Sequence, residues 1–215
     1  MAICGHRQES VDLALEELAA AFPAQARAGK VAGKAADVKN HDEVGELFRF
    51  VDSTFGGLDV LVNNAGVGVF CSARDLSLDE WKAVIDTNLS GVFYCSREAL
   101  FRFVTRGSGY IVNISSLAGS NAFAGGAAYN ASKFGLNGLS EAMMQDVRSD
   151  NVRVSYVMPG SVATGFSGRA DNSGSDWKVW PQDVAEIVRM LLSMPARTLV
   201  SRVEVRPSKP GKSGR

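Results

Sequence analysis

Two residues that could exchange a proton with a substrate, Tyr129 and Lys133, lie four positions apart in a segment with a helical pattern. That spacing places the phenol and the ammonium on one face of the helix. A phenol has an ordinary pKa of about 10 and is a poor base at neutral pH, but an adjacent cation favours the phenolate and lowers that pKa. The pair is therefore predicted to act as an acid and base.

A hydroxyl that could hold the reacting oxygen lies upstream of this pair. Residues 111–114 form an apolar run typical of a buried strand, and Ser115 and Ser116 follow it directly. Ser116, 13 residues before Tyr129, is the better placed to position a carbonyl or alcohol oxygen beside the phenol. A Tyr–Lys pair alone is common on solvated helix faces, so the prediction of proton transfer at a carbinol oxygen depends on this context.

The composition is that of one folded domain. The chain has 215 residues, of which 46% are apolar and 21% charged, which excludes a disordered chain and predicts one sizeable core. Lys and Arg total 23, as do Asp and Glu, and this balance does not favour nucleic acid as a partner. Three widely spaced cysteines and the absence of a long apolar run predict a cytoplasmic protein without a disulfide framework, zinc site or membrane span.

Apolar periodicity predicts strands that alternate with helices. Strands are expected at 1–4, 30–38, 58–62, 110–114, 152–157 and 203–205, and helices at 10–22, 42–55, 77–106, 129–148 and 181–192. Ser10 is a plausible N-cap, Ser77 and Glu80 form a capping box, and a break or kink is expected near Asn88. The alternation predicts a single-domain α/β fold with a doubly wound parallel sheet over residues 1–207, and the basic tail 208–215 is expected to be disordered.

Small and polar residues gather where the predicted strands end. In an open parallel sheet, ligands bind beyond the carboxyl ends of the strands. The turn Asn63-Asn64-Ala65-Gly66 and the pair Pro159-Gly160 fall at such ends. Their small side chains would let the backbone approach a flat ligand closely, although such turns are also common without one.

These motifs, in this order, resemble the short-chain dehydrogenase/reductase family, in particular its NADP(H)-preferring members of the 3-oxoacyl-ACP reductase type. The resemblance covers nearly the whole chain and implies a Rossmann-type sheet. It implies that Tyr129 is the general acid or base, and that Lys133 lowers its pKa and binds the nicotinamide ribose. It further implies that Ser116 orients the substrate oxygen and that Asn88 holds a water that relays protons to solvent.

The resemblance also implies a set of cofactor contacts at the strand ends. These contacts are to the adenine, the adenosine ribose, the nicotinamide carboxamide and the diphosphate. The residues that would make them are Asp37, Val38, Asn64, Ala65, Gly66, Tyr129, Lys133, Pro159, Gly160, Val162 and Thr164. The segment Gly5-His6-Arg7 occupies the site that distinguishes the 2'-phosphate. Because no acid lies there and Arg7 is available, NADP(H) is favoured over NAD.

The chain departs from the family pattern at its front. The family begins with a strand, a glycine-rich TGxxxGxG turn and a helix that receives the diphosphate, and none of these is found in this sequence. In the family's strand order that strand lies mid-sheet, so its neighbours would keep unpaired N–H and C=O groups. We therefore expect an N-terminally truncated fold and a longer parent chain.

The sequence thus predicts an oxidoreductase that transfers hydride between NADP(H) and a carbonyl or secondary alcohol. A catalytically silent domain that serves as a binding or assembly partner is the alternative, and an isomerase or dehydratase on the same fold is a third class. Phe123 and the 166–180 loop, with Trp177 and Trp180, indicate an apolar acyl or ring-bearing substrate such as a 3-oxoacyl thioester. The resemblance implies a homodimer or homotetramer formed through the helices that carry Asn88 and Tyr129.

Overall fold

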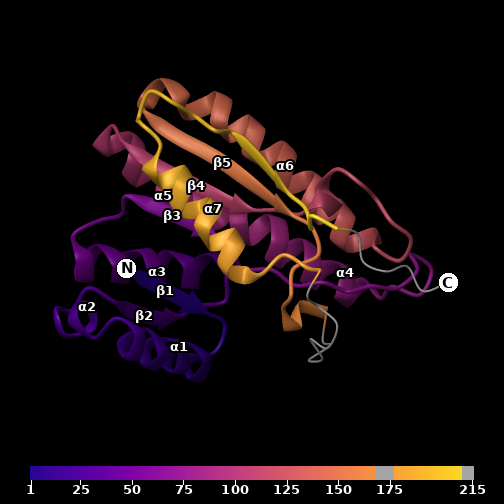
Figure 1. The fold of residues 1–215 in the computed structure, drawn as a ribbon, viewed down its shortest axis with the longest axis horizontal. Coiled ribbons are helices and arrows are strands. Elements are labelled where there is room, and N and C mark those ends of the chain that lie inside the picture. The colour runs from indigo at the N-terminus through magenta and orange to yellow at the C-terminus, as the bar shows by residue number, and fades with distance from the viewer. Residues whose placement is uncertain (168–176, 210–215) are drawn as a thin grey trace.

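The computed structural model describes residues 1–167 and 177–209, and its strands and helices alternate as predicted, with one further short helix at Pro23–Arg27 (Figure 1). Their bounds are β1 Ala2–Gly5, α1 Gln8–Ala21, α2 Pro23–Arg27, β2 Ala32–Ala35, α3 His41–Phe55, β3 Val60–Asn63, α4 Leu78–Ile85, the π-helical turn η1 Asp86–Ser90, α5 Gly91–Arg106, β4 Gly109–Ile114, the 3₁₀ turn η2 Leu117–Gly119, α6 Ala127–Val147, the 3₁₀ turn η3 Arg148–Asp150, β5 Val152–Pro159, the 3₁₀ turn η4 Gly165–Ser167, α7 Pro181–Ser193 and β6 Arg202–Val205.

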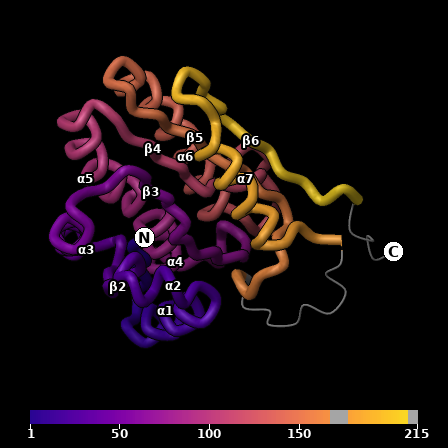
Figure 2. The backbone as a smooth tube through the Cα atoms, turned by 60° about the vertical axis from the view of Figure 1, so that its left-hand side comes forward, coloured from indigo at the N-terminus to yellow at the C-terminus, as the bar shows by residue number. Residues whose placement is uncertain are grey.

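All strand pairs are parallel, but they form two sheets. One has the order β1-β2 and the other the order β3-β4-β5-β6, so in the described part of the chain β1 and β3 each keep one unpaired edge. The first sheet lies with α1 and α2 at one end of the molecule, away from β5 and α6, in both views (Figure 1, Figure 2). The α/β fold with parallel strands is confirmed.

Side chains beside the open edges are incompletely covered. Val62 in β3 is 41% exposed, which is unusual for an apolar residue next to the core strand β4. A cavity of 610 Å³ lies between β1 and α1, with Ile3, Val11 and Leu18 among its lining residues. Apolar surface is therefore left open on the side of the two edges.

The larger sheet is covered on both faces by different helices. Alternate residues of β4 point to opposite faces, as a strand requires. Ile111 packs in a cluster with side chains of α3, α5 and α6, such as Phe103 and Met143. Tyr110 and Val112 pack in a second cluster with Leu191 of α7. The doubly wound arrangement thus holds the carboxyl ends of β3, β4 and β5 at one edge.

Some local predictions hold and others are wrong. Ser77 and Glu80 form the predicted capping box at α4. Asn88 lies not in a break but in the π-helical turn, which keeps α4 and α5 continuous. Ser10 is not an N-cap, because α1 begins two residues earlier after Arg7 and has no side-chain cap. Phe22, the last residue of the predicted helix, is exposed because it follows the last residue of α1, at the junction with Pro23.

Other bounds shift by a few residues, the largest change being β2, which is shorter than the predicted 30–38. Most of the predicted disordered tail, residues 210–215, lies outside the described residues. In the part of the chain that the structure describes, no helix is both long and apolar enough to cross a bilayer.

The start of β4 has a steric requirement that a substitution can test. A Cβ atom at Gly109 would lie 2.1 Å from Cγ of the buried Phe103, whereas one at Gly138 on α6 would meet nothing within 4 Å. We predict that Gly109→Ala lowers the free energy of unfolding by about 1–3 kcal/mol through overpacking. Gly138→Ala, the control, should raise it by up to about 1 kcal/mol, as expected for an exposed helix position. Urea unfolding of both variants measures this, and equal effects would contradict the packing described.

Candidate active site

Helix α6 brings the predicted acid–base pair to the carboxyl edge of the larger sheet. Lys133 is only 5% exposed, and its ammonium donates a hydrogen bond to the Ile114 carbonyl oxygen at the end of β4 (2.9 Å). Its Nζ atom lies 5.9 Å from the centroid of the Tyr129 ring. The two side chains therefore share one helix face, as their spacing predicts.

The pKa values of the pair differ from the prediction. Burial lowers the pKa of Lys133 to about 8. Burial raises the pKa of Tyr129, and a hydrogen bond with Ser116 opposes this rise. The prediction that Lys133 lowers the tyrosine pKa is therefore wrong for this form of the protein, since the ammonium lies over the ring and is hydrogen-bonded to a backbone carbonyl.

Ser116 lies beside the phenol because the loop after β4 turns back toward α6. Its hydroxyl accepts a hydrogen bond from the Ala118 amide (3.1 Å) and contacts the Pro159 carbonyl oxygen at the end of β5 (3.5 Å). The same hydroxyl interacts with Tyr129. Ser116, Tyr129 and Lys133 thus come together from one loop and one helix.

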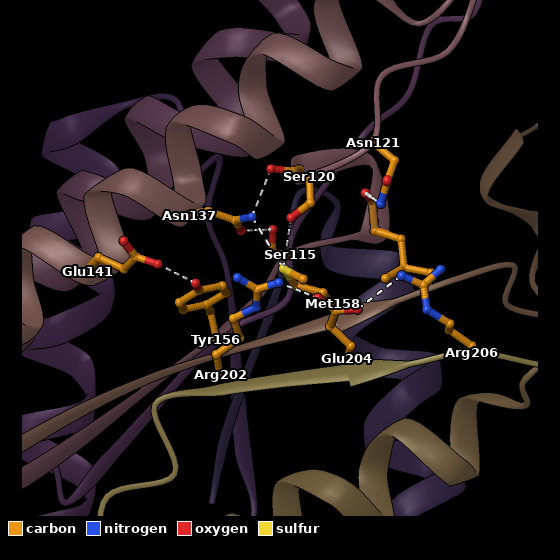
Figure 3. Close-up of polar contacts among 12 residues, drawn as sticks. Ser115, Ser120, Asn121, Asn137, Glu141, Tyr156, Met158, Arg202, Glu204 and Arg206 are labelled. Atoms are coloured by element: carbon orange, nitrogen blue, oxygen red, sulfur yellow. Dashed lines mark hydrogen bonds and ion pairs between the residues drawn. The ribbon is translucent and has the colours of Figure 1, made fainter.

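Two buried asparagines on α6 tie this loop to the helix. Asn130 donates to the Ala118 carbonyl oxygen (2.7 Å), and Asn137 donates to that of Gly119 (3.0 Å). Asn137 also accepts a hydrogen bond from the buried Ser115 hydroxyl (Figure 3). The sequence analysis missed both asparagines; the signal was two amides seven residues apart on the helix face of Tyr129 and Lys133.

A glycine permits this close contact. A Cβ atom at Gly119 would lie 2.6 Å from the Asn137 amide nitrogen and 2.7 Å from the Lys133 carbonyl oxygen. Any larger residue would push the loop away from α6, and Ser116 would move with it.

Asn88 holds the next loop against the same helix. Its side chain is fully buried and pairs with both backbone groups of Val67, accepting from the amide and donating to the carbonyl (2.8 Å each). It also donates to the Ser132 hydroxyl (3.0 Å). Asn88 therefore positions the segment after β3, and its π-helical turn is a feature often found at functional sites.

The turn after β3 lies beside these residues. Asn63 is buried and donates to Asn113 on β4 (2.8 Å), which anchors the turn. The predicted contact residues Asn64 and Ala65 are exposed. A Cβ atom at Gly66 would lie 3.4 Å from Asn88 Oδ1 and 3.9 Å from Lys133 Nζ, so this backbone adjoins the lysine.

At the ends of β1 and β2, Asp37 has a histidine and a lysine beside it. Its carboxylate lies 3.6 Å from His6 Nε2 and 3.3 Å from Lys39 Nζ. Arg7 is exposed at the start of α1. Val38 packs so close to the start of α5 that a Cβ atom at Gly91 would lie 2.9 Å from it. These predicted contacts belong to the smaller sheet and its border with α5.

The segment after β5 is held by main-chain pairing with β6 and with the chain just before α7. Gly160 donates to the Val205 carbonyl oxygen (2.7 Å), and Val162 forms a β-bridge with Val179. Thr164 is exposed, and its hydroxyl accepts from the Phe166 amide (3.4 Å). Most of the 166–180 loop singled out in the sequence, residues 168–176, lies outside the described residues.

Tyr156 on β5 provides a contrast with Tyr129. Its hydroxyl donates to Glu141 on α6 (2.5 Å), near Arg202 of β6 (Figure 3). Burial and the adjacent carboxylate raise its pKa to about 12. This tyrosine is held protonated by an acid, whereas Tyr129 has a serine and a lysine beside it.

A comparison with known proteins agrees with this geometry. Residues 1–173 match the model of the family described as short chain dehydrogenase. The chain belongs to the short-chain dehydrogenase family. An uncharacterized oxidoreductase of Staphylococcus aureus strain N315 is 33% identical over 171 residues, which are 80% of this chain and 74% of the relative.

Two further relatives extend the comparison. A sepiapterin reductase of Chlorobaculum tepidum is 37% identical over 174 residues, which are 80% of this chain and 71% of that protein. The crystal structure of a metagenomic short-chain oxidoreductase in complex with NADP is similar with a TM-score of 0.81 and 33% identity, covering 97% of this chain and 86% of that one.

The buried amine of Lys133 predicts a pH effect on stability. Below pH 8 the folded and unfolded chains both carry the charge; between about pH 8 and 10.5 the folded chain has lost the proton and the unfolded chain keeps it. Stability should therefore rise with pH in this window relative to Lys133→Met, by up to about 1.4 kcal/mol per pH unit. Urea unfolding from pH 7 to 10.5 measures it.

Lys82→Met is the control for this measurement. Lys82 is exposed, and a hydrogen bond with Asp86 raises its pKa instead of lowering it. Replacing Lys82 should therefore not abolish the rise in stability between pH 8 and 10.5. Parallel curves for the wild-type protein and Lys133→Met would show that the buried amine keeps its ordinary pKa.

Proposed function

We propose that this chain is an NADP(H)-dependent oxidoreductase that interconverts a ketone and a secondary alcohol. The observation that carries the proposal is the convergence of Ser116, Tyr129 and Lys133 at the carboxyl edge of a parallel sheet. The family and the NADP complex of a similar enzyme support it. A 3-oxoacyl thioester is one substrate of this class.

The residues present fit part of such a cofactor. Gly66 leaves the backbone open beside Lys133, which suits a ribose. Arg7 and Lys39 offer cationic groups at the ends of β1 and β2 for a 2'-phosphate, and the His6 imidazole lies at the same place. The described residues include no glycine-rich turn to bind the diphosphate, so the fit is incomplete on that side.

The bound nicotinamide would supply or accept the hydride at the substrate carbon. The protein's residues orient the substrate oxygen and exchange a proton with it. Ser116 donates a hydrogen bond that orients it, and Tyr129, kept protonated by burial, gives it a proton during reduction; in the reverse direction the Tyr129 phenolate takes that proton back. After reduction, the Lys133 ammonium gives a proton to the phenolate, and Asn88 holds the water that links the lysine amine to solvent.

The role of Tyr129 can be tested by removing its hydroxyl oxygen. Tyr129→Phe should lower kcat for ketone reduction at least about 100-fold, because the proton donor is lost. Tyr94→Phe, a partly exposed tyrosine on α5, is the control and should keep its activity. Steady-state rates with NADPH measure both, and an active Tyr129→Phe would refute the assignment.

The open edges of β1 and β3 are suited to receive one parallel strand, and we propose that a strand–turn–helix unit of the family completes the domain there. Adding such a unit of about 30 residues before Met1 should strengthen NADPH binding at least about tenfold, since one charge-assisted hydrogen bond contributes about 1.5–3 kcal/mol. NADPH fluorescence compares the two chains. Absence of binding by both folded chains would favour the alternative, a catalytically silent domain that binds other proteins.

We also propose a homo-oligomer formed through the helices that carry Asn88 and Tyr129. Large apolar side chains are exposed on α5 and α6, among them Phe101 and Phe134. Phe101→Glu should shift the protein toward monomer in sedimentation, whereas Leu13→Glu on α1, also exposed, should not. A monomeric wild-type protein would overturn this proposal.

We further propose that the protein works in the cytoplasm. The free cysteines fit a reducing cytoplasm.

A further inference from the structure

Three phenylalanines from three separate loops form an aromatic cluster with Tyr129. The ring of Phe70 lies 5.4 Å from the tyrosine ring in an edge-on arrangement, and that of Phe166 lies at 5.6 Å. Phe123 joins the group through Phe70, at 6.0 Å between ring centroids. The tyrosine ring therefore has aromatic side chains from the loops after β3 and β5 beside it, and Phe70 connects them to a third ring from the loop after β4.

The backbone holds these rings in place. Cys71, next to Phe70, forms a parallel β-bridge with Gly126 just before α6. A Cβ atom at Gly68 would lie 2.8 Å from Phe166 and 2.9 Å from Phe70, so both rings converge on that glycine. The arrangement is thus built by main-chain pairing and by a close approach that only glycine allows.

All three rings are also open to solvent. Phe70, Phe123 and Phe166 are 44%, 48% and 42% exposed. Single exposed aromatics are common on proteins, but three that cluster at a half-buried proton donor mark a binding surface. A substrate oxygen that reaches the Tyr129 hydroxyl must place its substituents against these rings.

We propose that Phe70, Phe123 and Phe166 select a carbonyl substrate that bears an aromatic ring, such as an aryl ketone or the corresponding benzylic alcohol. The proposal rests on the proposed function and names its substrate class. Ring faces and edges at 5–6 Å from one another favour a further aromatic ring, which gains offset or edge-on contacts that a saturated ring of the same size lacks. A linear acyl chain would gain none of them.

The test compares acetophenone with cyclohexyl methyl ketone, which has the same skeleton and a saturated ring. Saturation-transfer NMR on the full chain measures the binding of each without hydride transfer. We expect acetophenone to bind about three- to tenfold more tightly, the size of one aromatic contact. Phe70→Leu should abolish this preference, while Phe93→Leu, an exposed phenylalanine on α5, should keep it.

The readout is the ratio of the two affinities, because a merely structural role of Phe70 would weaken the binding of both ketones equally. An unchanged ratio in Phe70→Leu, equal binding of the two ketones by the wild-type protein, or no binding of either would overturn the inference. Suppose instead that acetophenone binds selectively but is not reduced with NADPH, even by a chain that binds this cofactor. This inference would then stand, and the proposed function would be refuted.

Discussion

The attachment of one loop to one helix determines the geometry of the candidate site. Asn130 and Asn137 bind backbone carbonyls of the loop after β4, and Gly119 lets loop and helix approach closely enough for these bonds. Ser116 is part of that loop, while Tyr129 and Lys133 are part of that helix. Because buried amides are costly to leave unpaired, the loop and the helix have one favourable arrangement. That arrangement fixes the positions of Ser116, Tyr129 and Lys133 relative to one another.

Burial gives the site its protonation properties. An amine removed from water favours its neutral form, and a phenol removed from water also favours its neutral form. Lys133 and Tyr129 thus shift apart on the pH scale: burial moves the lysine pKa from slightly above the ordinary tyrosine value down to about 8, and it moves the tyrosine pKa upward. Transfer of a proton from the Lys133 ammonium to a Tyr129 phenolate is therefore more favourable than transfer from a solvated lysine.

The sequence predicts local features well and long-range ones poorly. The order of elements, the Ser77–Glu80 capping box and the shared face of Tyr129 and Lys133 follow from spacing alone. The direction of the Tyr129 pKa shift does not, because burial depends on the whole fold. Phe70 was missed for a similar reason, since only the bridge between two distant loops brings it to the tyrosine.

The unpaired edges of β1 and β3 have a consequence for handling the protein. Open edges present rows of free N–H and C=O groups that pair readily with strands of other molecules. Those of β1 and β3 lie beside uncovered apolar side chains such as Val62. As the protein is concentrated, intermolecular β-pairing becomes a route to precipitation, and dilute samples will report the behaviour of the single molecule most faithfully.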